Sequence, residues 1–306
     1  MALYLGRTIV PIFEDPDDMS LSLKIKRGVQ FVKQKLYRII HDIEVILKLA
    51  DAPSGVAFEP QFRKYHGIRL TSAEQAAMLE LESLVGDQIP KVSIIKWNTF
   101  GFVASDNHIT ELGLYDRGLT SLPDIIGNLT SLETLWLNDN KLSSLPESIG
   151  SLTSLKILYL WRNKLSSLPD IIHKMTWLQV LRLGGNKLSS LPEKINKLIG
   201  LKVLDLNLNQ LSSLPETIGS LISLKELHLM GNKLSSLPDS IGSLTSLKEL
   251  YLIDNKLSSL PDSIGSLKSL EIIRLNSNKL TSIPGRIKRE LKKLKDNGCY
   301  VFGVDL

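Results

Sequence analysis

Hydrophobic and polar positions repeat every 23 residues from residue 108 onward, without insertion. Eight units begin at residues 108, 131, 154, 177, 200, 223, 246 and 269. In each unit a stretch such as Thr134–Asn138 alternates polar and apolar side chains, which predicts a short strand with its leucines inward. A following stretch such as residues 149–152 suits a short helical or 3₁₀ turn. Repetition at this period predicts a solenoid in which each unit packs only on its neighbours.

Asparagine and proline recur at fixed places in the units. The asparagines are residues 140, 163, 186, 209, 232, 255 and 278, and the first unit has Arg117 instead. The prolines are residues 123, 146, 169, 192, 215, 238, 261 and 284. We expect each asparagine amide to turn inward and satisfy backbone groups that would otherwise be buried without partners. The prolines are expected to end the inward strand pattern.

The pattern LxxLxLxxNxLxxLPxxIGxL resembles the leucine-rich repeat family. More narrowly, it is similar to the 23-residue intracellular class of Ras-suppressor and plant Ras-group proteins. The resemblance covers residues 108–291, and departs from the pattern at Arg117 and after Ile287, where Glu290 takes an apolar place. It implies an α/β fold, a curved parallel sheet on the concave side with short helical or 3₁₀ turns on the convex side. Small GTPases or their regulators are the partners that this analogy suggests.

The segments before the repeats are predicted to cover the open end of the core. A capping-box pattern at residues 72–75 favours a helix that ends near Val85, and residues 100–107 predict a strand and a turn. We therefore divide the chain into a helical N-terminal region (1–90), an N-terminal cap (91–107), eight repeats (108–291) and a C-terminal cap (292–306).

Residues 20–50 carry a heptad pattern of apolar side chains. Its members are Ile25, Val29, Val32, Leu36, Ile39, Ile43, Ile46 and Ala50. The helix that they predict allows three interpretations. It packs on its own chain, it forms a coiled coil with another copy or a partner through residues 25–50, or its basic first half lies on a membrane surface.

A second helix is predicted at Arg286–Asn297, with Ile287, Leu291 and Leu294 on one face, followed by a strand from Cys299 to Val304. It is expected to cap the last unit. Its cations offer an alternative contact with acidic lipid or RNA phosphate, although they lack the interleaved aromatic residues of a nucleic-acid site.

Charge narrows the choice of partner. The 306 residues carry 37 Lys and Arg against 32 Asp and Glu, a net charge of +5. Residues 286–295 alone account for +5, six basic against one acidic, so the rest of the chain is balanced. This distribution argues against a nucleic-acid partner. The single cysteine excludes an internal disulfide, no apolar run is long enough to span a bilayer, and the N-terminus lacks signal-peptide features, so we expect a cytoplasmic protein.

Motifs for chemistry are missing from the sequence. No phosphate-binding loop or dinucleotide motif is present, the five histidines lack metal-ligand spacing, and Cys299 has no histidine near it in sequence. We therefore predict no cofactor, no metal and no enzyme activity.

Sequence variety is concentrated at the positions that flank the inward leucines of the strands. Aromatic and arginine side chains there are the types that dominate binding energy at interfaces. The predicted binding residues are Tyr115, Trp136, Tyr159, Trp161, Arg162 and Arg182, with a weaker patch at His228, Met230, Tyr251 and Ile253. An alternative is that the aromatic rings only stabilise neighbouring strands.

The sequence thus predicts a non-enzymatic adaptor or scaffold that binds a protein on its concave face. A peripheral membrane or self-assembling protein acting through residues 20–50 is the alternative. A third possibility is an accessory subunit of an enzyme made by another chain.

Overall fold

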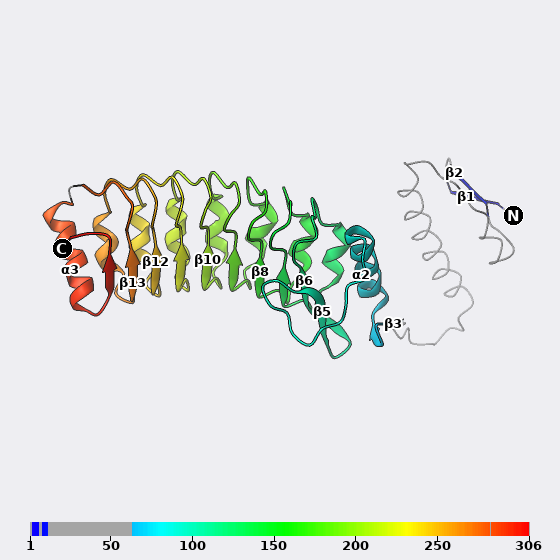
Figure 1. Cartoon of the computed structure of the whole chain (residues 1–306). Helices are drawn as coiled ribbons and strands as arrows, with labels where there is room; N and C mark the ends of the chain where they lie inside the picture. Colours follow the sequence, from blue (N-terminus) through cyan, green and yellow to red (C-terminus); the bar gives the residue numbers. More distant parts are fainter. Residues whose placement is uncertain (1, 6–7, 12–62, 282, 306) are drawn as a thin grey trace. The chain divides into compact units, whose positions relative to one another are not determined.

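The computed structural model describes residues 2–5, 8–11, 63–281 and 283–305 (Figure 1). The chain divides into two compact units, residues 1–59 and 60–306. In the first unit, β1 (Ala2–Leu5) pairs antiparallel with β2 (Thr8–Pro11). The predicted heptad helix at residues 20–50 lies outside the described residues, so all three of its interpretations stay predictions.

The second unit contains one long sheet. Ten described strands form it, in the order β14-β13-β12-β11-β10-β9-β8-β7-β6-β5. Their bounds are β5 Phe100–Ser105, β6 His108–Leu114, β7 Thr134–Trp136, β8 Ile157–Tyr159, β9 Val180–Arg182, β10 Val203–Asp205, β11 Glu226–His228, β12 Glu249–Tyr251, β13 Ile272–Arg274 and β14 Tyr300–Phe302. Neighbours from β6 to β14 are parallel, whereas β5 pairs antiparallel with β6. The register joins residues 23 apart, for example Leu135 with Leu158, which confirms the predicted solenoid.

Short 3₁₀ helices alternate with the strands, as the sequence predicts. Each has five residues: η2 Asp124–Asn128, η3 Glu147–Ser151, η4 Asp170–Lys174, η5 Glu193–Lys197, η6 Glu216–Ser220, η7 Asp239–Ser243 and η8 Asp262–Ser266. The repeated proline precedes each one in an extended conformation. Proline suits this place because its fixed φ and missing N–H are tolerated where a helix begins.

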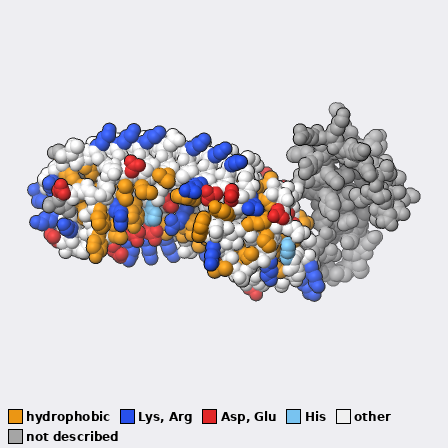
Figure 2. Space-filling view, in the orientation of Figure 1, with side chains coloured by type: hydrophobic (Ala, Val, Ile, Leu, Met, Phe, Trp, Pro, Cys, Tyr) orange, Lys and Arg blue, Asp and Glu red, His pale blue; other side chains and the backbone are white. Residues whose placement is uncertain are grey.

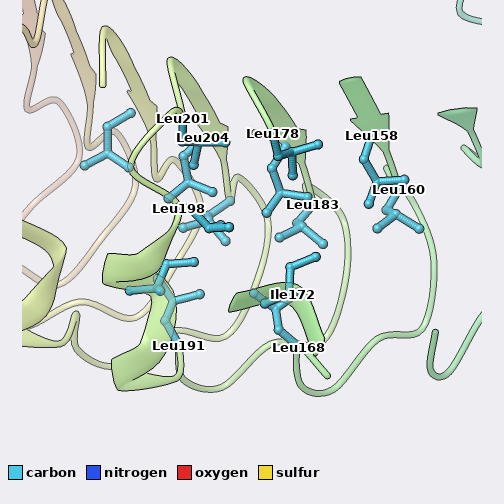
Figure 3. Packing of buried hydrophobic residues seen from close by; sticks show 14 of the residues in the cluster. Leu158, Leu160, Leu168, Ile172, Leu178, Leu183, Leu191, Leu198, Leu201 and Leu204 are labelled. Carbon is cyan, nitrogen blue, oxygen red and sulfur yellow. The ribbon is translucent and has the colours of Figure 1, made fainter. Parts of the chain in front are cut away.

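The core is a stack of leucines and isoleucines between the sheet and the 3₁₀ helices (Figure 3). In one unit, Leu178 and Leu183 flank the strand β9 and meet Ile195 and Leu198 from the helix side, all with no exposed surface. Each unit supplies one such layer. Because a single layer would leave apolar faces open, only the stack of units is stable.

A ladder of asparagines joins the units, which confirms the prediction made for them. In the middle of the stack, Asn186 donates through Nδ2 to the carbonyl oxygens of Leu160 (2.9 Å) and Leu183 (2.8 Å). Its Oδ1 accepts from the N–H of Leu165 at 3.0 Å. Two of these three partners belong to the preceding unit. The first repeat has no such unit before it, which gives Arg117 a physical reason for replacing the asparagine.

The residue before each asparagine has a left-handed backbone. Positive φ occurs at Asp139, Arg162, Gly185, Leu208, Gly231, Asp254 and Ser277, and also at Asp116, which precedes Arg117 in the first unit. This conformation aims the N–H at the next unit, as in Leu208, which donates to the carbonyl of Met230 at 2.7 Å. Only two units use glycine there, so the repeat pattern did not mark the position.

The N-terminal end of the solenoid is closed by a hairpin and a helix. Strands β3 (Arg63–Tyr65) and β4 (Ile68–Leu70) precede α2 (Ser72–Val85), whose Met78 and Leu81 are buried in the same cluster as the repeats. The hairpin and α2, assigned above to the region 1–90, therefore fold within the same compact unit as the repeats. The predicted helix is confirmed with one correction. Its N-cap is Thr71, which forms the capping box with Glu74, because the side chain of Thr71 accepts from the Glu74 N–H.

The C-terminal end is closed by α3 (Gly285–Asp296) and β14, close to the predicted bounds. Ile287, Leu291 and Leu294 are buried against the last repeat, as expected. Within the described residues, no helix is both long and apolar enough to cross a bilayer.

Candidate binding surface on the sheet

The sheet face is the side of the long sheet that points away from the leucine core. On most repeat strands the middle residue is buried and its two neighbours are half-buried on this face. Because the strands are in register, equivalent residues of successive units form rows. The central row consists of Gly113, Trp136, Tyr159, Arg182, Asp205, His228, Tyr251, Arg274 and Phe302.

The first half of the central row brings together three predicted residues. The rings of Trp136 and Tyr159 are stacked, with centroids 3.7 Å apart and planes 11° apart. The guanidinium of Arg182 lies 5.8 Å from the Tyr159 ring centroid. It also forms an ion pair with the buried carboxylate of Asp205 at 3.4 Å. Neighbouring side chains thus hold one another in place by stacking and charge.

The second half of the row repeats this arrangement. His228 meets the Tyr251 ring edge-on, with centroids 4.8 Å apart. The guanidinium of Arg274 lies 5.8 Å from the Tyr251 centroid and 4.9 Å from that of Phe302. Residues from both predicted patches therefore lie along a single row.

Trp161 and Arg162 lie at the side of the central row, just after the end of β8. Trp161 packs over Gly184, where a Cβ would lie 1.9 Å from the indole nitrogen, so this glycine makes room for the ring. The guanidinium of Arg162 lies 4.7 Å from the Trp161 centroid and 3.5 Å from the carboxylate of Asp139. Met230 occupies the equivalent side position in a later unit and is half-buried.

Tyr115 is held by the N-terminal cap. Its ring meets Trp97 edge-on, with centroids 5.7 Å apart. The cap crosses the sheet face here and passes directly over Gly113. A side chain at residue 113 would collide with the carbonyl oxygen of Thr99, so only glycine fits beneath the cap. Tyr115 therefore belongs to the junction between cap and repeats, while the open part of the central row begins at Trp136.

Three exposed aromatic residues were missed by the sequence prediction. Trp97 is 62% exposed at one end of the sheet, and Tyr300 (67%) and Phe302 (41%) lie at the other end. All three belong to the caps, outside the repeat pattern used to locate the binding face. The sequence of residues 299–304 predicts a strand, but it does not indicate that the rings of Tyr300 and Phe302 are exposed.

Two carboxylates and a histidine meet on the sheet face. Glu226 and Glu249 are paired residues of adjacent strands, and one donor atom from each, with one from His228, all lie within 4.8 Å of one another. The Tyr251 hydroxyl donates to Glu249 Oε2 at 2.9 Å. Burial first, and then this bond and the charge of Glu249, raise the pKa of Tyr251 above its usual value. The sequence prediction named no metal ligands, because Glu226 and His228 belong to one unit and Glu249 to the next, and only the strand register brings the three together.

Lysines form a row along one long edge of the solenoid, and Figure 2 shows basic side chains lined up along that edge. The edge lysine row consists of Lys141, Lys164, Lys187, Lys233, Lys256 and Lys279, with Gln210 in the gap. All six lysines are exposed, and none forms an ion pair with a carboxylate of the described residues. The net charge of a segment does not reveal this row, because an acidic residue at the start of each 3₁₀ helix balances the lysine in number.

Cys299 lies in the C-terminal cap and is buried. Burial raises the pKa of its thiol to about 11. A thiol with this pKa is almost wholly protonated at neutral pH and is a poor nucleophile.

Comparison with known proteins identifies the family. The sequence model of the leucine-rich repeat region matches residues 96–190 and 181–259, together more than half of the chain. This chain belongs to the leucine-rich repeat family. Proteins built from such repeats use extended concave surfaces for protein interactions, which makes the fold of this family member an interaction module. The match does not assign the Ras-suppressor class, which stays a prediction.

Solved structures give the same fold. A leucine-rich repeat protein of Leptospira interrogans is 34% identical over 63% of this chain and 53% of its own, with a TM-score of 0.55. The repeat domain of the type III effector XopL is 31% identical over 64% of this chain and 69% of its own, with a TM-score of 0.55. PEPR1, solved with AtPEP1, is 32% identical over 68% of this chain and 32% of its own, with a TM-score of 0.57. A search of curated proteins gives no significant match.

Proposed function

We propose that the chain is a non-enzymatic adaptor or scaffold that binds a partner protein on its sheet face, in the cytoplasm. The observation that carries this proposal is the central row. Tryptophan, tyrosine and arginine side chains follow one another along a rigid sheet, and each is half-buried and held by its neighbour. Side chains ordered in advance lose little conformational entropy on binding, which favours affinity.

Exposed rings at both ends extend this surface. Trp97 continues it onto the N-terminal cap, and Tyr300 and Phe302 continue it onto β14. The mixed charge of the row, with Arg182 paired to Asp205, suits a protein more than a uniformly charged polymer. PEPR1, a structural relative, was solved together with AtPEP1, which supports a protein ligand in general terms. A small GTPase or its regulator remains a partner suggested by family analogy alone.

Affinity capture from the native cell extract tests the proposal. The wild-type chain is compared with the double variant Trp136→Ala/Trp161→Ala. Loss of one large ring at an interface hot spot costs about 2 kcal/mol or more, roughly thirtyfold in affinity, so the partner band should disappear. Trp177→Ala is the matched control, because Trp177 donates to the carbonyl of Leu152 away from the central row.

The expected result is capture by the wild type and by Trp177→Ala, but not by the double variant. Circular dichroism and a thermal melt establish that the double variant is folded. Equal capture by all three proteins would show that the central row is not the binding surface.

A further inference from the structure

Glu226 and Glu249 are an unusual pair of neighbours. They face each other on adjacent parallel strands, where like charges destabilise a sheet. Among the described residues, neither carboxylate forms an ion pair with a lysine or arginine. Glu271, the next glutamate along the chain, is by contrast paired with Lys248 at 2.6 Å. The two carboxylates on the sheet face therefore lack a permanent cation.

His228 completes the cluster. Its Nε2 lies 3.4 Å from Glu226 Oε2, is shielded from solvent and makes no hydrogen bond within the described structure. A ring nitrogen that is shielded from solvent and lacks a hydrogen-bond partner destabilises the folded state, so its presence in a native structure calls for an explanation. Asp205, the neighbour of His228 on the other side, is already occupied by Arg182 and by the N–H of Asn207. The ring nitrogen thus has no hydrogen-bond partner, and neither carboxylate of the cluster is paired with a lysine or an arginine of the described residues.

We propose that Glu226, His228 and Glu249 form a binding site for Zn²⁺. In a tetrahedral zinc site with bonds of about 2.0–2.1 Å, donor atoms lie about 3.4 Å apart. The pair formed by Glu226 and His228 already has this separation, and rotation of the Glu249 side chain brings in the third donor. The ion neutralises the two carboxylates and gives the imidazole nitrogen its partner.

The donor set selects the kind of metal. Imidazole suits zinc and its neighbours in the first transition row, whereas Mg²⁺ and Ca²⁺ prefer oxygen donors alone. The Tyr251 hydroxyl holds Glu249 in the way that outer-shell groups commonly orient carboxylate ligands. Three protein donors leave the fourth position open for water or for a side chain of a bound protein.

The residues of this cluster differ from those at the equivalent positions of most other units. The position of Glu226 and Glu249 is held by Glu111 in the first unit and by uncharged residues in the remaining units, namely Thr134, Ile157, Val180, Val203 and Ile272. Only the units that begin at residues 223 and 246 place acidic residues at this position on two adjacent strands, Glu226 and Glu249, with a histidine, His228, beside them. The cluster is therefore not a by-product of the repeated frame.

Calorimetric titration of the metal-free full chain with zinc chloride at neutral pH tests this inference. We expect saturable binding of one equivalent through this site. Glu249→Gln and His228→Ala should raise the dissociation constant roughly tenfold or more, since each removes a donor. Glu271→Gln and His173→Ala, which remove a carboxylate and an imidazole elsewhere, should bind Zn²⁺ as the wild type does.

Two further readouts decide the result. Zn²⁺ should raise the melting temperature of the wild type more than that of Glu249→Gln, a near-isosteric change that preserves the fold. Excess Mg²⁺ should not displace Zn²⁺. Absence of saturable binding, wild-type affinity in Glu249→Gln, or displacement by Mg²⁺ would each overturn the proposal. Because the titration uses the metal alone, its outcome is independent of partner capture through Trp136 and Trp161.

Discussion

Individual residues hold this solenoid together where the chain turns between strand and helix. Each asparagine of the ladder replaces backbone hydrogen bonds that a tight inward turn cannot make, and Asn186 does so while only 7% exposed. A shorter or apolar side chain leaves the buried carbonyls and N–H group of two units without partners. The amide thus stabilises the contact between units as well as its own turn.

Asn186→Ala should therefore destabilise the protein strongly. With three bonded backbone groups affected, we expect a loss of roughly 2–4 kcal/mol in the free energy of unfolding. Urea unfolding followed by circular dichroism measures the change. Asn278→Ala, in the last asparagine position, is the comparison. Its bonds are half-buried at the end of the ladder, so its loss should be smaller, and an equal loss in both variants would contradict this account.

Elements at the two ends of the solenoid cover the apolar faces that the first and last repeats would otherwise expose. A repeat exposes one apolar face to each side, so the first and last layers need covers of a different sequence. Helix α2 covers the first layer, and α3 covers the last with Ile287, Leu291 and Leu294. The six basic residues of the segment 286–295 fall mainly on the outer side of α3 and leave its inner face apolar.

Leu291→Ala should open the C-terminal end of the core. Leu291 is fully buried, and removing such a side chain costs about 2–5 kcal/mol. Lys292→Ala, a neighbour on the exposed side of α3, should change the stability by no more than about 0.5 kcal/mol. Thermal unfolding compares the two variants. A similar shift for both would mean that α3 does not act as a cover of the core.

Across the whole molecule, the fold sorts charges that are mixed along the chain. Strands of the sheet lie about 4.8 Å apart, so the six residues of the edge lysine row become near neighbours although 23 or more residues separate them in sequence. Like charges at such spacing repel one another. The unit that carries Gln210 in place of a lysine offers an internal reference for the effect.

Lys187→Gln should stabilise the solenoid at low salt, and Gln210→Lys should destabilise it. We expect the free energy of unfolding to rise by about 0.2–0.5 kcal/mol in Lys187→Gln and to fall by a similar amount in Gln210→Lys, as for other pairs of exposed like charges. Both effects should fade as salt approaches 1 M, where the screening length falls to about 3 Å. Urea unfolding at low and high salt measures them. Persistence of the difference at high salt would show that side-chain packing, not charge, is responsible.

Much of the architecture follows from sequence because the repeat is local. Twenty-three residues specify one strand, one turn and one 3₁₀ helix, and their apolar spacing leaves stacking as the stable arrangement. The capping residues of α2 and the left-handed position before each asparagine were harder to locate. Thr71 and Ser72 are adjacent residues that both carry a hydroxyl group, so the sequence alone does not show which of them is the N-cap of α2. The left-handed position is filled by Asp, Arg, Leu, Ser or Gly and so leaves no consistent mark.

The solenoid, its ladder of asparagines and the face where its variable residues lie can be read from one unit and its period, because they depend on nothing else. Which residues become neighbours across units depends on the three-dimensional arrangement. Only the strand register stacks Trp136 on Tyr159, places residues of both predicted patches in one row, and brings one donor atom each of Glu226, His228 and Glu249 within 4.8 Å. Such contacts depend on alignment between strands, and no single unit carries that information.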